Sequence, residues 1–239
     1  ADENGIKTSD FRAADYSINI TYSKKIDSLL TFGITVKNIY SDYEMYNSTA
    51  LAMDAGITYF NPDNKFAAGF VIRNLGMQIN AYTPGDSKEP LPFNIAAGIS
   101  KGLAHAPFTF SLVFNHLEKW DLTYKPDADR EEDADEELLN MGSSSESGFD
   151  KFFDQFMRHV VVGTTLDIGK NLEIRVGYNY RRRQELKIDT KTGMVGFSLG
   201  AGVKLNKFKI SYGRSVYHLA GGTNHFSFSM NLDEFSRKF

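Results

Sequence analysis

The feature that most limits how this chain can fold is a stretch near its end, residues 225–232, with the sequence HFSFSMNL. Apolar and polar side chains alternate along this stretch without interruption. Because successive side chains of a β-strand point to opposite faces of a sheet, the stretch predicts a strand with one apolar and one polar face. A single strand of this kind fits a soluble sheet as well as a membrane barrel, so recurrence of the pattern decides between them.

The same alternation recurs along the whole chain, in about eleven segments of strand length. Their apolar positions begin at residues 16, 30, 51, 68, 93, 108, 160, 172, 195, 208 and 226. Short connections follow residues 23, 59, 100, 166 and 205, and long connections follow residues 37, 73, 115, 181 and 212. This alternation of short and long connections is typical of an antiparallel up-and-down transmembrane β-barrel, whose short turns are periplasmic and whose long loops are extracellular.

Hydropathy and aromatic placement favour a transmembrane barrel over a soluble all-β domain, which is the alternative. The sequence has no run of about 18 apolar residues that would predict a transmembrane helix, but a transmembrane strand needs only about 9 to 11 residues. Several tyrosines fall near the expected strand ends, where barrels carry an aromatic girdle: Tyr16, Tyr22, Tyr59, Tyr178, Tyr180 and Tyr212. We therefore expect an all-β protein of the bacterial outer membrane, with its apolar face against lipid and its polar face around an enclosed interior.

Composition excludes several other classes of protein. The chain has 239 residues and no break in composition that would mark two domains, so we expect one domain. Its formal net charge is -3 and its lysines and arginines are dispersed, which argues against a nucleic-acid partner. It has no cysteine, and its five histidines lack the spacing of zinc ligands. We therefore expect no metal and no cofactor. His225 and Ser227 could suggest a barrel lipase, but no third residue orients them, so we expect no catalytic residues and no enzyme activity.

Strand parity gives an expectation about what precedes the first residue. Bacterial barrels close with an even number of strands. Eleven expected strands and a periplasmic carboxyl end therefore predict an odd number of strands upstream of Ala1. We expect residues 1–239 to be the C-terminal portion of one outer-membrane barrel.

The largest insertion, residues 119–157, is expected to be a long acidic extracellular loop that contains a short helix. Residues 127–137 carry eight carboxylates and one arginine, which predicts a solvated loop. A surface that binds divalent cations is the alternative, although the spacing lacks the glycine and the final glutamate of a calcium loop. Phe149, Phe152, Phe153 and Phe156 follow at the spacing of one helix face.

Two expected outer segments are candidate partner-binding surfaces, because tryptophan and tyrosine dominate binding hot spots and exposed aromatic loops need cover. The first is Trp120, Leu122 and Tyr124 in the sequence HLEKWDLTY, and the second is Tyr217, His218 and Leu219. Packing of these residues against the rim of the barrel itself is the alternative.

Charged residues give two further expectations. Arg181, Arg182 and Arg183 follow an expected strand at its outer end, and arginine is geometrically suited to the phosphates of lipopolysaccharide. The alternative for these three residues is a solvated loop start. Four charged residues on the expected inner face should pair with one another or with a plug: Asp54, Arg73, Glu173 and Arg175.

Six segments together resemble the PorV/PorQ family, a group of FadL-like outer-membrane proteins of the type IX secretion system in Bacteroidetes. They are FRAADYSINITYSKKID (residues 11–27), SDYEMYNS (41–48), VIRNLG (71–76), EPLPFNIAAGISKGLAHAPFTFS (89–111), HLEKWDLTY (116–124) and YHLAGGTNHFSFSMNLDEF (217–235). The resemblance extends over nearly the whole chain and is to the PorQ branch of the family. It implies a barrel of about 14 strands, and hence about three strands upstream of Ala1.

The resemblance also implies a function. It implies a non-catalytic barrel in the attachment complex with PorU, PorV and PorZ, which anchors the surface protein PorZ so that cargo is processed and attached to anionic lipopolysaccharide. The distant relationship to FadL-like barrels leaves an alternative, an outer-membrane conduit for a hydrophobic small molecule. The family supplies no site motif, so every candidate residue named above is inferred from this sequence alone.

Overall fold

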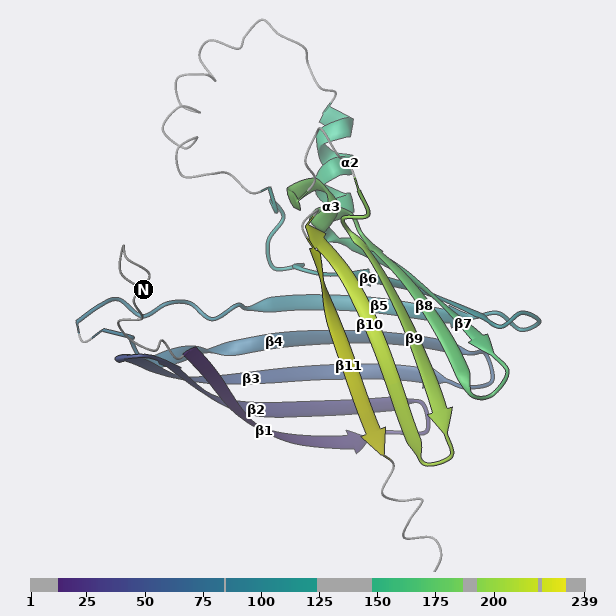
Figure 1. The fold of residues 1–239 in the computed structure, drawn as a ribbon, viewed down its shortest axis with the longest axis horizontal. Helices are drawn as coiled ribbons and strands as arrows, with labels where there is room; N and C mark the ends of the chain where they lie inside the picture. Colours follow the sequence, from purple (N-terminus) through teal and green to yellow (C-terminus); the bar gives the residue numbers. More distant parts are fainter. Residues whose placement is uncertain (1–12, 84, 124–147, 187–192, 219–220, 231–239) are drawn as a thin grey trace, which may run out of the picture. The chain divides into compact units, whose positions relative to one another are not determined.

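The computed structural model describes residues 13–83, 85–123, 148–186, 193–218 and 221–230. Its strands and helices are β1 Ala13–Lys25, β2 Leu30–Tyr43, β3 Tyr46–Asn61, β4 Phe66–Asn80, β5 Asn94–Gly102, β6 Phe108–Phe114, α2 Gly148–His159, β7 Val160–Ile168, β8 Leu172–Asn179, α3 Tyr180–Leu186, β9 Phe197–Leu205, β10 Phe208–His218 and β11 Gly221–Met230 (Figure 1). The eleven strands form one open antiparallel sheet in the order of the sequence. The expected all-β, up-and-down antiparallel topology is therefore confirmed.

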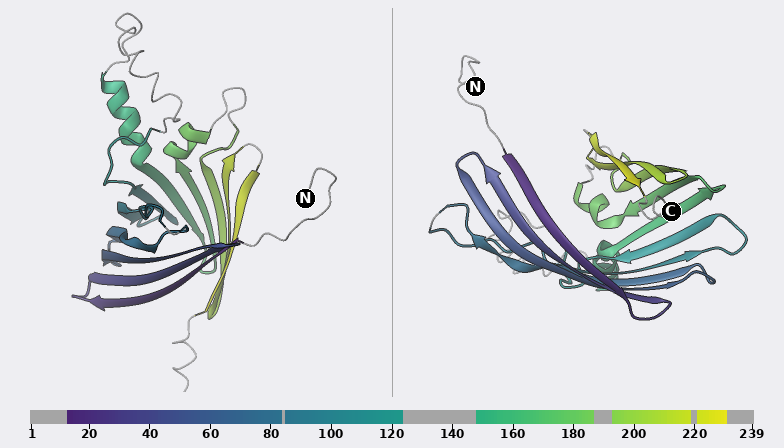
Figure 2. Two further views of the ribbon diagram at one scale, coloured as in Figure 1. Left: turned by 90° about the vertical axis from the view of Figure 1, so that its left-hand side faces the viewer. Right: turned by 90° about the horizontal axis from the view of Figure 1, so that it is seen from below.

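Contacts along the chain define two compact units. The first comprises Ala1–Asn61 and Ala67–Ala97, and the second comprises Pro62–Phe66 and Gly98–Phe239. Within the second unit, β7 to β11 spread as a twisted fan, as the right-handed twist of strands requires (Figure 2). None of the described helices has the length and the apolar character needed to cross a membrane.

The first unit places its apolar side chains on an exposed face, which we call the outward face of the sheet. Ile18 and Ile20 of β1 are 70% and 73% exposed there. On the opposite side, the inner face, Ala52 of β3 is only 2% exposed. Alternation along each strand therefore divides apolar from polar and small side chains, as expected, and the apolar set is the exposed one.

The first unit also corrects the expected long loop after residue 37. β2 continues to Tyr43 and β3 begins at Tyr46, so the two strands are joined by a turn of Glu44 and Met45, with Glu44 at φ 59°. The Tyr43 hydroxyl donates to Asp15 Oδ1 on β1 at 2.8 Å. The loop prediction was wrong because backbone pairing continues through residues whose side chains are polar on both faces.

A second correction concerns residues 75–80, which were expected to start a loop but continue β4. Asn74 has a φ of 55°, and the alternation reverses there, as a β-bulge with one extra residue makes it do. Phe70 is exposed before this point, and Leu75 and Met77 are 52% and 67% exposed after it. The alternation of apolar and polar residues is therefore interrupted at Arg73, because the bulge moves the apolar positions of β4 by one residue.

In the second unit, the expected loop after residue 212 is a tight hairpin. β10 runs to His218, and β11 begins at Gly221, with Gly222 paired with Val216. A Cβ at Gly222 would lie 2.5 Å from the Ser215 carbonyl oxygen, so glycine here permits close strand pairing. Tyr217 and His218 therefore lie in a strand, whereas Leu219 is outside the described residues.

Exposure of the outward face continues in the second unit. Phe226 and Phe228 of β11 are 80% and 67% exposed, and Leu199 of β9 is 50% exposed. In a soluble β-sandwich these side chains would fill the space between two sheets. The described chain instead forms a single sheet whose large apolar residues are on the surface.

Candidate functional site

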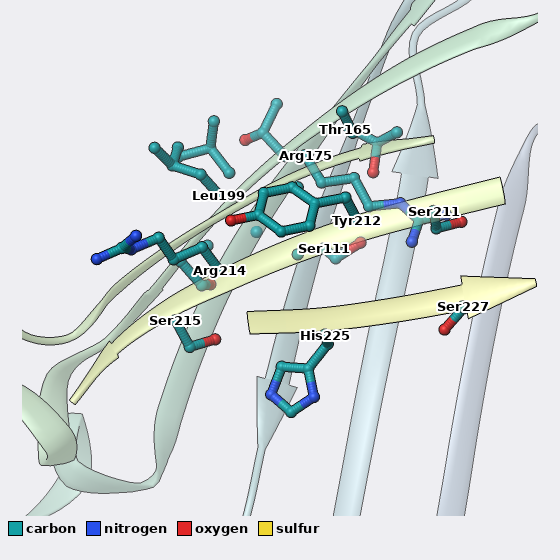
Figure 3. Close-up of a pocket in the computed structure, with 18 residues that line it drawn as sticks. Ser111, Thr165, Arg175, Leu199, Ser211, Tyr212, Arg214, Ser215, His225 and Ser227 are labelled. Carbon is teal, nitrogen blue, oxygen red and sulfur yellow. The ribbon is translucent and has the colours of Figure 1, made fainter. Parts of the chain in front are cut away.

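The inner face of the second unit forms a shallow basin of about 420 Å³ (Figure 3). Its lining is rich in hydroxyl groups and glycine, with Ser111, Ser211 and Ser227 among the labelled residues. His225 Nε2 lies 3.2 Å from Thr223 Oγ1 in the same strand. The basin offers polar groups and bare backbone, and few apolar side chains, to anything inside it.

Charged residues on the two inner faces form separate pairs. Glu173 binds Arg175, as expected, and also Lys209 Nζ at 2.8 Å. Asp54 binds Lys37 Nζ at 2.6 Å. The sequence analysis missed Lys37 as the partner of Asp54, although both alternate onto the inner face of adjacent strands.

The inner face of the first unit is covered by its own chain. Residues 85–93, before β5, return over it, and the Glu89 N–H donates to Gln78 Oε1 at 2.7 Å. Gln78 in turn donates to Ser48 Oγ at 2.7 Å, and Gln78 and Ser48 are each only 4% exposed. A cavity of only about 160 Å³ is left beside this segment.

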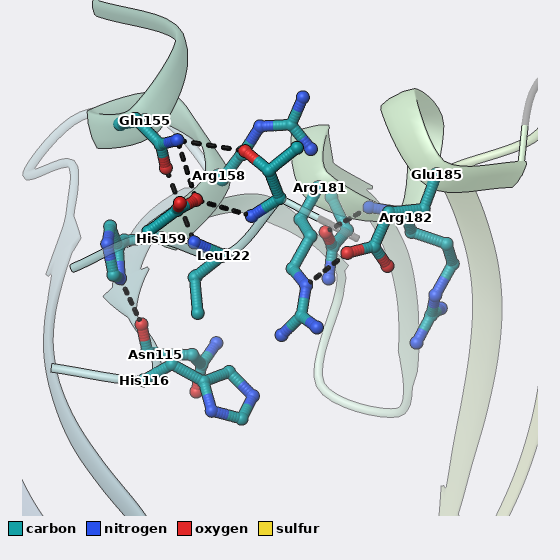
Figure 4. Close-up of polar contacts among 12 residues, drawn as sticks. Asn115, His116, Leu122, Gln155, Arg158, His159, Arg181, Arg182 and Glu185 are labelled. Atoms are coloured by element: carbon teal, nitrogen blue, oxygen red, sulfur yellow. Dashed lines mark hydrogen bonds and ion pairs between the residues drawn. The ribbon is translucent and has the colours of Figure 1, made fainter. Parts of the chain in front are cut away.

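The most developed cluster of aromatic and polar side chains lies at the end of the second unit that carries α2 and α3, away from the short β7–β8 and β9–β10 turns (Figure 1). We call residues 115–123, α2 and α3 together the cap. Its polar contacts link segments far apart in the sequence (Figure 4). These contacts decide which cap residues face outward.

Buried His159, at the end of α2, fastens residues 115–120 to the helix. Its Nδ1 lies 2.8 Å from the Asn115 carbonyl oxygen and its Nε2 lies 3.1 Å from the Trp120 carbonyl oxygen. His159 is 4% exposed. Because both ring nitrogens face carbonyl oxygens, the ring fixes the path of this segment along α2.

Gln155 fastens the next part of the segment. Its Nε2 donates to Asp121 Oδ1 and to Thr123 Oγ1, each at 2.8 Å, and its Oε1 accepts from the Leu122 N–H at 3.3 Å. Leu122 is 5% exposed, so its side chain packs inside the cap and is not available to a partner. This corrects the expectation that Leu122 belongs to a binding surface.

Four exposed aromatic rings form what we call the aromatic surface: Trp120, Phe149, Phe152 and Phe153, which are 54%, 71%, 56% and 51% exposed. Trp120 packs on Phe152 with ring centroids 5.4 Å apart, and Phe149 stacks on Phe153 at 6.4 Å. At the base of α2, Phe156 contacts Phe114 of β6 at 5.9 Å. Tyr124, the other expected binding residue here, lies outside the described residues, as does the acidic run 127–137.

α2 and α3 are joined through Asp154. It accepts a hydrogen bond from the Tyr180 hydroxyl at 2.7 Å and pairs with Arg158 at 2.7 Å. Burial, and then the adjacent Asp154 carboxylate, raise the pKa of Tyr180 above its usual value. Tyr180 therefore holds the cap together, which corrects its expected place in an aromatic girdle.

The three arginines expected to bind lipopolysaccharide lie in α3, not at a loop start. Arg181 pairs with Glu185 at 2.7 Å, and the Arg182 guanidinium lies 4.0 Å from the centre of the Tyr217 ring. Arg183 Nη1 donates to the Gly193 carbonyl oxygen at 2.8 Å. These contacts occupy part of the donor capacity of Arg181 and Arg183 and place the Arg182 guanidinium on the ring of Tyr217.

Neither metal ligands nor relatives add to this description. Among the described residues, no three His, Asp or Glu side chains are close enough to hold a metal ion together. No family model matches the sequence, and no curated protein matches it. The resemblance to the PorV/PorQ family therefore depends on the six segments quoted above.

Proposed function

We propose that this chain belongs to a PorQ-type β-barrel of the bacterial outer membrane, with the strands closed into a cylinder. Its function is to anchor the surface protein PorZ beside PorU and PorV in the type IX attachment complex, where cargo is processed and joined to anionic lipopolysaccharide. The barrel itself carries out no catalysis.

The observation that carries the membrane part of this proposal is the exposed apolar outward face. Fully burying one Phe, Leu or Ile side chain is worth about 1.5–3 kcal/mol, and many such residues are exposed in both units. Hydrocarbon around the outward face would recover this energy. Closure of the sheet would leave no strand edge unpaired in lipid.

The anchoring part is supported by the aromatic surface of the cap. Three exposed rings on α2, and Trp120 on the segment that His159 and Gln155 fix to α2, form a preordered surface. Preordered aromatic residues lose little entropy on binding and are enriched in interface hot spots. The surface therefore suits a protein partner on the outer side of the membrane.

The inner faces weigh against the FadL-like alternative. A conduit for a hydrophobic molecule needs an apolar pocket, whereas the second unit lines its basin with serine, threonine and glycine. In the first unit, residues 85–93 lie over the inner face. Anchoring is therefore the better-supported function.

Membrane insertion is tested by fractionation and by surfactant dependence of the full chain. We expect the protein to sediment with outer membranes, to resist carbonate extraction and to need detergent for a monodisperse state. A monodisperse protein in detergent-free buffer would contradict the barrel.

Partner binding is tested by co-purification of PorZ from detergent extracts. We expect Trp120→Ala with Phe152→Ala to reduce the recovered PorZ by at least about tenfold, because both rings belong to one hot spot. Phe60→Ala is the matched control, since Phe60 is 54% exposed outside the cap and on β3. Equal recovery with the double variant and the control would refute docking at the cap.

A further inference from the structure

The apolar outward face of β10 and β11 is interrupted by two polar residues. Arg214 of β10 and Asn224 of β11 lie directly opposite each other in the ladder, and both are exposed. Side chains directly opposite in an antiparallel pair have Cβ atoms about 4.5–5.5 Å apart, so the two can bind one group together. Two residues away on the same face, Phe226 is 80% exposed.

The close-up of the basin separates the two faces of β10. Arg214 and Tyr212 project from one side of the strand, and Ser215 and His225 lie on the other side (Figure 3). Arg214 is among the residues that line the basin, but its side chain alternates onto the face of Tyr212 and Phe226. It is a cation on the side of the sheet that we assign to lipid.

The side-chain donors of Arg214 and Asn224 do not bind a carboxylate of the described residues. The Tyr212 hydroxyl donates to Asn224 Oδ1 at 2.8 Å, which turns the Asn224 amide so that its Nδ2 hydrogens point elsewhere. Within the part of the chain that the structure describes, no carboxylate forms an ion pair with Arg214. The site thus offers a guanidinium and an amide donor that no carboxylate of the described residues balances.

Height along the strand places the pair in the half of the apolar band that lies toward the cap. Arg214 is six residues beyond Phe208, the first outward residue after the two-residue turn. At about 3.3 Å per residue and a strand tilt of about 40°, this is about 15 Å along the barrel axis. The long arginine side chain can extend further toward the edge of a band about 25 Å tall. That edge is on the same side as the cap, where the outer leaflet would be.

We infer that Arg214 and Asn224 form a phosphate-binding site on the barrel wall for a lipopolysaccharide molecule of the outer leaflet. This inference rests on the proposed outer-membrane location. The guanidinium binds two phosphate oxygens in parallel, and the Asn224 Nδ2 group donates to the third. The site differs from the expected one at Arg181 to Arg183, whose guanidinium groups already contact Glu185, the Tyr217 ring and the Gly193 carbonyl oxygen within the second unit.

The test compares two lipids on the full chain in mild detergent, with bound lipid counted by native mass spectrometry. The probes are lipid A with its phosphates and the same lipid after removal of the phosphates. We expect wild-type protein to prefer the phosphorylated form by about tenfold, as a charge-assisted bidentate contact supports. Arg214→Gln should abolish the preference, and Asn224→Leu should reduce it.

Arg175→Gln is the matched control, because it removes an exposed arginine from the inner face of the same sheet. It should keep the preference. An unchanged preference in Arg214→Gln would overturn the inference, and so would binding of inorganic phosphate as tight as that of the lipid. All variants should still fractionate with outer membranes; loss of wild-type protein from that fraction would instead refute the proposed location.

Discussion

The inner faces of the two units are polar in different ways. In the first unit, residues 85–93 return over the face, and Gln78 and Ser48 are each 4% exposed beneath them. In the second unit, serine, threonine and glycine line an open basin. Buried polar groups must keep their partners, whereas exposed ones can bind water instead. The same kind of alternating sequence therefore produces one face that is sensitive to substitution and one that tolerates it.

The largest expected difference comes from two glycines. A Cβ at Gly76 would overlap the Leu51 carbonyl oxygen and lie 2.6 Å from Ala52 Cα, whereas a Cβ at Gly163 would meet its nearest atom, Val176 O, at 3.6 Å. We expect Gly76→Ala to lower the free energy of unfolding by about 3 kcal/mol and Gly163→Ala to change it by less than about 0.5 kcal/mol. Urea unfolding in detergent micelles measures both. Equal effects would remove the contrast between the faces.

A smaller effect is expected from the polar contact beneath residues 85–93. Gln78→Leu removes the acceptor of the Glu89 N–H and the donor to Ser48, which should cost about 2 kcal/mol. Ser211→Ala, in the open basin, should cost less than about 0.5 kcal/mol. Limited proteolysis should also show faster cleavage within residues 85–93 in Gln78→Leu alone. Unchanged cleavage would mean that other contacts hold this segment.

Breaking a charge pair should also cost more stability in the first unit than in the second. Lys37→Met leaves Asp54 bound to the Asn74 N–H, and we expect a loss of about 1 kcal/mol. Lys209→Met leaves Glu173 paired with Arg175, so its loss should be under about 0.5 kcal/mol. The measurement is the free energy of unfolding of both variants at low and at high salt, because salt screens exposed charge pairs. A larger loss for Lys209→Met would contradict the expected order.

The last predicted stability change concerns the cap, the part of the second unit whose polar side chains do bind one another. The pKa of Tyr180 is raised above its usual 10.0, first by burial and then by Asp154. The protonated hydroxyl is the form that donates to Asp154, so its stabilisation is complete below the unfolded pKa and is lost as pH rises through the folded pKa. Tyr180→Phe should cost about 1 kcal/mol at neutral pH and nothing at strongly alkaline pH.

Tyrosinate absorbance provides the direct check on this direction. The difference between wild type and Tyr180→Phe isolates one tyrosine, and its titration should lie at higher pH than that of a denatured sample. A titration at or below the denatured value would show that Asp154 does not receive this hydrogen bond in solution.

Alternation in the sequence predicted the presence and order of the strands well, because side-chain hydropathy decides which face a residue takes. The alternation did not predict strand residues that pair through backbone hydrogen bonds without an apolar face. Residues 41–48 continue a hairpin although neither face is apolar, and the bulge at Asn74 hides the rest of β4. No side-chain pattern encodes an inserted residue of this kind.

The candidate site shows a similar division. Trp120 could be selected as an exposed aromatic residue from its type and surroundings, and the spacing of Phe149, Phe152 and Phe153 indicated a helix face. Burial of Leu122 could not be predicted, because it results from the hydrogen bonds of Gln155, 33 residues further along the chain. The outward position of Arg214 follows from the sequence, because Arg214 is two residues from Tyr212 in the same strand and so shares its face.

The sequential order of the strands has a consequence for how the protein is made. Each strand hydrogen-bonds to the one synthesised just before it, so hairpins can zip up one after another without a search for remote segments. Intermediates would present one growing edge at a time, which an assembly machine in the envelope could shield until the next hairpin arrives. Biogenesis of this chain is thereby a matter of local steps taken in order.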